Sequence, residues 1–314
     1  MLPLKIFFVA AEVAPYATVG GLSQVMYFLP KALIEMGHEV SIFMPKYGTI
    51  DEKKYNIKSL HTNLRVPTGE TSGITNLICN VKVRTGKKFE PTVYFLENME
   101  YYEQRANVYG YMDDPTRFAL LSRGALEFLK NTGAGQNLKP DVIHANDWHT
   151  GYLINYLRNS YRDDPEMLKI ASLFTIHNLA LQGVFDFRYS SPLESDDGKG
   201  ALASFLSERL KKQNGLKRGI IYADVVNTVS ERYSREILKT EYGHGLDGLL
   251  KEVRAKLYGV LNGLDYDDFN PDTDKLIKKD FTVKTLKYRV ENKVDLQKEF
   301  DLPVDEKIPV LAMS

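Results

Sequence analysis

The stretch "LKIFFVAAEVAPYATVGGLSQV", residues 4–25, decides the fold. Residues 4–11 are a short, nearly continuous apolar run, which is typical of a strand buried on both faces of a parallel sheet. A Gly-Gly pair at 20–21 precedes residues 22–36, whose apolar side chains recur at helical spacing. Gly37 ends that helix and "EVSIFMP", residues 39–45, begins another strand. Together they predict a βαβ unit with a right-handed crossover.

The same alternation continues along the chain. Helices are expected over 115–133, 150–159 and 231–239, and further strands over 92–98, 141–147, 169–178, 223–230 and 256–263. Strands that alternate with helices indicate an α/β fold with a doubly wound parallel sheet, Rossmann-like in its arrangement. Residues 186–217 begin polar and then turn helical, which indicates an insertion over the carboxyl edge of the sheet.

Composition narrows the class of protein. The 314 residues carry 41 Lys and Arg against 41 Asp and Glu, so no overall field recruits nucleic acid or an acidic membrane. No apolar stretch approaches the about 20 residues that span a bilayer, and the N-terminus lacks a secretory leader pattern. The lone Cys79 fits a reducing compartment and the role of a small core residue. We therefore expect a cytoplasmic protein.

Polar residues follow the strands at the edge where open α/β sheets bind ligands. They are Gly20-Gly21, Asn146 to His149, His177-Asn178, Ser230-Glu231 and Asn262-Gly263. A glycine pair lets the backbone approach a ligand closely and adopt positive φ, and the following helix points amides at an anion. A tight strand–helix turn explains the pair equally well. Neither GxGxxG nor GxxxxGK[ST] is present, which disfavours hydride transfer and ATP hydrolysis.

Three histidines raise separate questions. His144 and His149 flank Asp147, but strand alternation aims His144 away from a common centre, and no Cys or Glu completes a metal site. His177 leaves an apolar strand, where it either bonds a loop carbonyl or contacts a substrate hydroxyl or leaving phosphate. Asp147 beside Trp148 suits a sugar, although the indole ring itself is expected in the core.

Eight segments in order resemble bacterial glycogen synthases and plant starch synthases, glycosyltransferases that build α-1,4-glucan from ADP-glucose. They are "FFVAAEVAPYATVGGLSQV", "LPKALIEMGHEVSIFMPKYG", "RFALLSRGALEFL", "DVIHANDWHTG", "TIHNLALQGVF", "LKRGIIYADVVNTVSERYSREI", "YGHGLDGLL" and "LYGVLNGLDYDDFNP". The resemblance covers nearly the whole chain. It implies a GT-B architecture, in which two Rossmann-like domains face each other across a cleft.

The resemblance also implies a domain plan. Residues 1–263 would be the acceptor-side catalytic domain and 264–303 a linker. Residues 304–314, including the apolar "KIPVLAMS" at 307–314, would be the first strand of a truncated second domain that holds the donor nucleotide. On this plan the missing GT-B domain is a partner of the chain, and the 314 residues alone are expected to be inactive.

Site residues carry over from the family motifs. His177 would contact the transferred glucose, Asp147 would line the sugar site with Trp148, His149 and Asn178 beside it, and Asn262 would sit near the sugar. Gly20 and Gly21 would abut the donor diphosphate. The reaction implied is retaining hexosyl transfer to the glucan, with no metal and no cofactor, ADP-glucose being a substrate.

Two positions depart from the family pattern. Its Lys is Thr18 here, and its Asp is Gln24. A charge-assisted hydrogen bond is about twice as strong as a neutral one, so loss of the Lys would cost about 2 kcal/mol of transition-state binding, or some thirtyfold in rate. This departure leaves two alternatives open: a related transferase with another donor, such as UDP-glucose, and a non-catalytic glucan- or nucleotide-binding protein.

Overall fold

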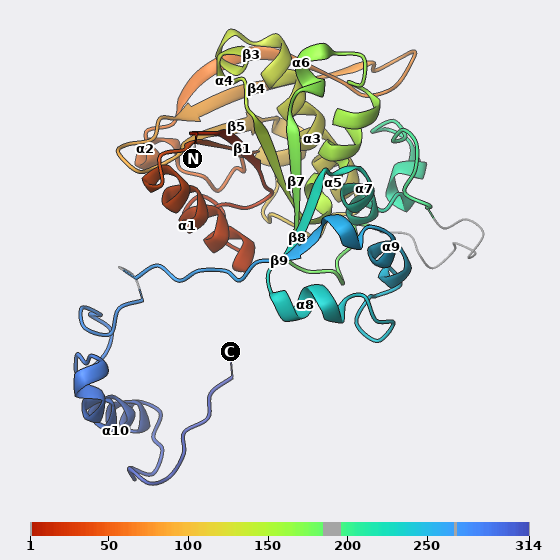
Figure 1. The fold of residues 1–314 in the computed structure, drawn as a ribbon. Coiled ribbons are helices and arrows are strands. Elements are labelled where there is room, and N and C mark those ends of the chain that lie inside the picture. Colours follow the sequence, from red (N-terminus) through yellow and green to blue (C-terminus); the bar gives the residue numbers. More distant parts are fainter. Residues whose placement is uncertain (1, 185–195, 267–268, 314) are drawn as a thin grey trace. The chain divides into compact units, whose positions relative to one another are not determined.

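The computed structural model describes residues 2–184, 196–266 and 269–313, which divide into two compact units, 1–262 and 263–314. The first unit is built on a nine-stranded sheet in the order β3-β4-β5-β2-β1-β6-β7-β8-β9 (Figure 1). The strands are β1 (Lys5–Val9), β2 (Glu39–Pro45), β3 (Lys58–Pro67), β4 (Asn76–Arg84), β5 (Thr92–Glu97), β6 (Val142–Asn146), β7 (Ala171–Ile176), β8 (Val225–Thr228) and β9 (Leu257–Gly259). All the pairings are parallel except the two made by β4, which runs antiparallel to β3 and to β5.

Strand β1 lies at the centre of the sheet. Ile6 is paired with Val40 of β2 on one side and with Val142 of β6 on the other. Phe7, Phe8 and Val9 are fully buried, so both faces of β1 are covered. This confirms the strand predicted from the apolar run and the mostly parallel α/β sheet predicted from the alternation.

Helices cover the sheet on both faces. In Figure 1, α1 (Gly21–Glu35) lies on one side, and α3 (Asp114–Asn131), α5 (Asp147–Asn159) and α7 (Gly215–Tyr222) lie together on the other. The core between sheet and helices is aromatic; the rings of Phe43 and Phe128 stack with centroids 5.5 Å apart. Shorter helices are α2 (Glu52–Tyr55), η1 (Met99–Glu103), α4 (Gly133–Leu138), α6 (Pro165–Leu168), η3 (Glu208–Lys212), α8 (Glu231–Glu236), α9 (Asp247–Glu252) and η4 (Arg254–Lys256).

The second unit contains η5 (Val283–Tyr288) and α10 (Arg289–Glu299). The strand expected over 307–314 is wrong for the part that is described, since residues 307–313 carry no strand. A strand needs a neighbour to satisfy its amides and carbonyls, and no other strand is described within this unit. Residues 186–195 of the expected insertion lie outside the described residues. No helix among the described residues is long and apolar enough to cross a bilayer.

Helices α5 and α7 approach closely because glycines face each other between them. A Cβ built on Gly151 would lie 1.9 Å from the carbonyl oxygen of Gly215, and one built on Gly215 would lie 2.5 Å from the carbonyl oxygen of Trp148. This contact fixes the backbone of α5, whose first residue is Asp147.

We expect Gly151→Ala to lower the free energy of unfolding by about 1–3 kcal/mol, because the added methyl group overpacks a backbone contact. Urea unfolding followed by circular dichroism measures the change. Gly248→Ala is the matched control: it lies in α9 with nothing within 4 Å of the added Cβ, and helix propensity raises its stability by up to about 1 kcal/mol. Equal shifts in the two variants would contradict the packing argument.

Candidate functional site

A cavity of about 670 Å³ lies beyond the carboxyl ends of the central strands. Eight of the ten residues predicted from the sequence line it: Gly20, Gly21, Asp147, Trp148, His149, His177, Asn178 and Asn262. Thr18 and Gln24 are exposed and are not among its lining residues. The cavity sits where the strand order reverses, since β1 connects to β2 on one side and pairs with β6 on the other. Open α/β sheets bind ligands at this switch point.

Asp147 ties the ends of two strands together. It is the first residue of α5 and has a φ of 56°, a left-handed conformation that Asp tolerates better than most residues. Its buried carboxylate accepts hydrogen bonds through Oδ1 from the amides of His177, at 2.8 Å, and Asn178, at 3.2 Å. The carboxylate therefore sets the position of the backbone that carries His177. Burial raises the pKa of Asp147 to about 7.

His177 is held in one tautomer by Asn146. The side-chain Nδ2 of Asn146 lies 3.3 Å from the Val9 carbonyl and 3.4 Å from the His144 carbonyl, to which it donates. The amide oxygen of Asn146 is thereby left as an acceptor, 3.0 Å from Nε2 of His177. We assign the proton to Nε2 from this network. Burial lowers the pKa of His177 to about 4, so at neutral pH its Nδ1 is a lone-pair acceptor, suited to a substrate hydroxyl.

Trp148 and His149 belong to an aromatic cluster on the wall of the cavity. Trp148 is only 5% exposed, and its ring centroid lies 4.3 Å from that of His149 and 5.2 Å from that of Phe118. A Cβ on Gly183 would lie 2.2 Å from the indole, so the loop backbone rests on that ring. The indole is thus a core group that supports the loop. Burial lowers the pKa of His149 to about 3, which keeps the ring neutral.

The glycine pair is held by a residue that the sequence did not point to. Glu12 is 4% exposed, and its Oε2 accepts hydrogen bonds from the amides of Val19, at 2.7 Å, and Gly20, at 2.9 Å. The expected positive φ is wrong, because neither Gly20 nor Gly21 is in that region; Gly20 is extended, with a φ of −138°. The carboxylate, not a left-handed residue, shapes the turn. A Cβ on Gly21 would meet nothing within 4 Å, so the space beside Gly21 is open, whereas one on Gly20 would lie 3.5 Å from Oε1 of Glu12.

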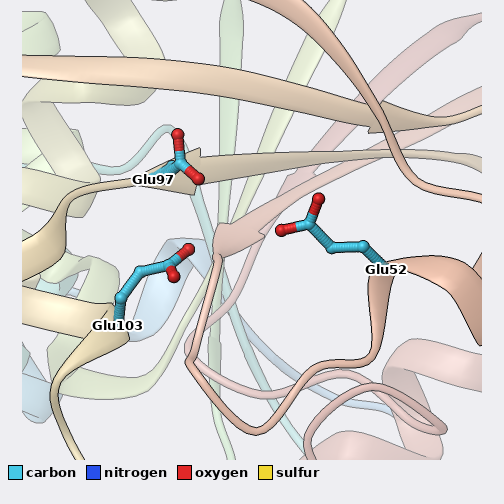
Figure 2. A group of neighbouring side chains, drawn as sticks. All are labelled: Glu52, Glu97 and Glu103. Carbon is cyan, nitrogen blue, oxygen red and sulfur yellow. The ribbon is translucent and has the colours of Figure 1, made fainter.

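His144 does not face the cavity. Its Nε2 lies 2.6 Å from Oγ1 of Thr175, and its ring packs on Phe8 at 4.5 Å between centroids. The described residues bring the ligand atoms of at least three acidic or histidine side chains within 4.8 Å of one another only at Glu52, Glu97 and Glu103 (Figure 2).

The three carboxylates of this cluster are paired with lysine side chains. Nζ of the buried Lys46 lies 3.3 Å from Oε1 of Glu52 and 3.4 Å from Oε1 of Glu103. Lys82 pairs with Glu52 at 2.7 Å and also with Glu97. Two ammonium groups therefore compensate the charge that a divalent metal would neutralise. The network joins α2, β5 and η1 as a structural ion-pair cluster.

Comparison with known proteins agrees with the geometry. Residues 5–252 match the family model described as the starch synthase catalytic domain. Glycogen synthase 1 of Geobacter metallireducens is 38% identical over 100% of this chain and 61% of its own length. Glycogen synthase of Thermotoga maritima is 38% identical over 99% of this chain and 62% of its own length. The chain therefore spans less than two thirds of these relatives.

A solved structure is also similar. The catalytic domain of starch synthase IV from Arabidopsis thaliana, bound to ADP and acarbose, superposes with a TM-score of 0.75 at 30% identity. The match covers 96% of this chain and 60% of that one. The nine-stranded, mostly parallel sheet is thus that of a GT-B catalytic domain.

We expect Glu12→Ala to speed amide hydrogen exchange at Val19 and Gly20 about tenfold, because both amides lose a charge-assisted hydrogen bond. Glu12→Gln is the matched control, since its amide oxygen still accepts from the same donors. NMR measures amide exchange in the two variants. Fast exchange in Glu12→Ala together with slow exchange in Glu12→Gln would assign the effect to the side-chain oxygen that accepts the two hydrogen bonds. Unchanged exchange in the alanine variant would show that Glu12 does not hold the loop.

Asp147→Asn should become more stable than the parent protein as pH rises. The folded pKa, about 7, lies above the ordinary value of 3.8, so the stability contributed by the protonated carboxyl is full below pH 4 and is lost as pH rises through 7. The asparagine oxygen keeps both backbone bonds without titrating. We expect the difference in unfolding free energy between variant and parent to grow by about 2 kcal/mol from pH 5 to pH 8.

Denaturant unfolding at several pH values measures this difference. Asp272→Asn, which removes an exposed carboxyl, is the control. A flat difference for Asp147→Asn across this range would mean that the buried carboxyl is already ionised at pH 5.

Proposed function

The chain belongs to the starch synthase catalytic domain family, and from that premise we propose that it is the acceptor-side part of a glycogen- or starch-synthase-type glucosyltransferase. The reaction is transfer of glucose from ADP-glucose to the non-reducing end of an α-1,4-glucan, with retention of the anomeric configuration. One observation carries the proposal: Gly20, Asp147, His177 and Asn262, far apart in sequence, line the same cavity at the switch point of the sheet.

The proposed roles follow the contacts. His177 receives a hydrogen bond from a hydroxyl of the transferred glucose on its neutral Nδ1, while Asn146 fixes its ring. Asp147 acts through the backbone of His177 and Asn178, so we assign it to positioning rather than to proton transfer. Asn178 and Asn262 bond sugar hydroxyls, and the open space beside Gly21 admits the diphosphate.

Charge in the cavity supports a need for a second wall. Glu12, Asp114 and Asp147 line it, and no Lys or Arg is among its described lining residues. A departing diphosphate needs positive groups or amide donors preorganised around it. We propose that these come from a second domain that follows a linker over residues 264–303, begins at residues 304–314 and extends into the part of the relatives' length that this chain does not cover. Without this second domain, we expect the 314 residues neither to exclude water from the cavity nor to catalyse glucose transfer.

A related transferase with another donor is the second candidate, and Thr18 and Gln24 favour it. They stand where the family pattern has a cation and an anion, and both are exposed, Thr18 in the loop before α1 and Gln24 in its first turn. A hydroxyl and an amide retain hydrogen bonding without charge. A binding protein without catalysis is the third candidate, and turnover tests it directly.

We expect a chimera to transfer glucose from ADP-glucose to glycogen: this chain followed by the unmatched C-terminal part of the Thermotoga maritima glycogen synthase. His177→Ala should lower kcat at least a hundredfold, because a hydroxyl of the transferred glucose loses its hydrogen-bond acceptor, Nδ1 of His177. His61→Ala, on β3 and outside the cavity lining, should stay within about threefold. Release of ADP and incorporation of labelled glucose are the readouts, each with UDP-glucose in parallel.

Three other outcomes of this experiment would each contradict part of the proposed function. Faster transfer from UDP-glucose favours the second candidate. A folded chimera that binds glycogen but transfers nothing from either donor overturns the transferase. Equal loss in His177→Ala and His61→Ala would assign His177 a structural role only.

A further inference from the structure

A second cavity, of about 630 Å³, lies between helix α1, helix α2 and the turn that joins β4 to β5. Its volume falls within the about 300–1,000 Å³ of small-molecule sites. None of the ten residues assigned to the transferase site lines it. Pro15 and Tyr16 form one wall, and Arg84, Lys87 and Phe89 form another.

Charge in this cavity departs from that of the chain. The whole chain is neutral, yet five of the six charged side chains lining the cavity are cationic: Lys31, Lys54, Lys58, Arg84 and Lys87, against Glu90 alone. Glu90 is engaged by Arg84, with Oε2 2.5 Å from Nη2. Lys58 and Lys87 have no ion pair with a carboxylate in the part of the chain that the structure describes. Like charges that converge on one cavity repel, and a bound anion relieves that repulsion.

Aromatic rings share the cavity with these cations. Tyr27 and Phe89 are 41% and 43% exposed, which is unusual for rings that line a concavity. Tyr16 is held edge-on by Tyr55, with centroids 4.9 Å apart, and by Phe95 at 5.1 Å. Phe89 has a φ of 64°, a conformation that bulky side chains rarely adopt. Backbone strain of this kind collects at ligand sites, where the surroundings maintain it.

We propose that this cavity binds a phosphate ester that carries a ring, of the size of a sugar phosphate or a nucleoside monophosphate. Lys58, Lys87 and Arg84 receive the phosphate, since ammonium and guanidinium groups are its usual protein partners. The exposed side chains of Tyr27 and Phe89 receive the ring, and Nζ of Lys88 lies 4.9 Å from the centroid of the Phe89 ring. The proposal stands whether or not the transferase function holds, because it uses other residues.

An occupant of this cavity contacts the segment that carries the glycine pair. Pro15 and Tyr16 line the second cavity, whereas Glu12 and Gly20 of the same segment line the first. The segment is folded tightly, because the carbonyl of Val13 accepts from the amides of Tyr16, at 3.0 Å, and Ala17, at 2.9 Å. A bound ester is therefore expected to slow amide exchange at Gly20.

Isothermal titration of the full chain with AMP and with glucose 6-phosphate tests the proposal. Adenosine, glucose, inorganic phosphate and maltotriose are the reference probes. We expect at least one ester to bind tenfold or more tighter than its unphosphorylated form and than inorganic phosphate. Lys58→Glu with Lys87→Glu should weaken it at least tenfold, and Phe89→Ala at least threefold.

The matched control is Lys239→Glu with Lys298→Glu, the same charge change at exposed positions that line neither cavity. It should bind the ester within twofold of the parent, and circular dichroism checks that each variant is folded. Three results overturn the proposal: inorganic phosphate binding as tightly as the esters, maltotriose binding as tightly as the esters, or ester binding that ignores the Lys58 and Lys87 changes. The last result would place the ester elsewhere, including the first cavity.

Discussion

Burial of β1 on both faces is the constraint from which the site follows. Phe7, Phe8 and Val9 have no exposed surface, so β1 must sit inside the sheet with a partner on each side. One partner, β2, is reached through α1, and the other, β6, is reached only after the antiparallel excursion through β3 to β5. The connections therefore diverge at the carboxyl end of β1. That divergence leaves the crevice in which the glycine pair, Asp147 and His177 meet.

Two buried carboxylates convert this crevice into a defined site. Glu12 fixes the loop after β1 and Asp147 fixes the loop after β7, each by accepting two backbone amides. Backbone donors hold a carboxylate without introducing a positive side chain into the lining of the cavity. The raised pKa of Asp147 is the electrostatic consequence, caused by burial and increased by Glu12 nearby. A site of this kind favours uncharged hydroxyls over anions unless a cation is supplied from outside.

The central strands and most of the residues that line the cavity are predictable from the sequence, because both follow from apolar runs and from the order of strands and helices along the chain. Residues 39–45 were predicted as a strand and form β2, since their apolar run has one interpretation in an α/β chain. Eight predicted residues meet in one cavity because the carboxyl ends of parallel strands share an edge. Glu12 could not be found this way: its partners are amides seven and eight residues later, which leave no periodic trace. The mostly exposed strand β3 was missed because it lacks an apolar pattern, and 307–313 was mistaken for a strand because apolar content alone does not provide a neighbour.

Charged side chains of opposite sign line the two cavities, although the chain as a whole is neutral. Three carboxylates and no described cation line the first, whereas five cations and one carboxylate line the second. The segment from Glu12 to Gly21 contributes to both walls: Glu12 and the glycine pair at its ends line the first cavity, and Pro15 and Tyr16 in its middle line the second. The Debye length is about 8 Å at physiological ionic strength, so the electrostatic field of one cavity still acts across a single loop. An anion that occupies the cationic side cancels part of the field that the glycine loop experiences. That loop is held by local backbone hydrogen bonds and by the Glu12 carboxylate rather than by a ladder between strands, so its position is more easily shifted than that of the strands around it.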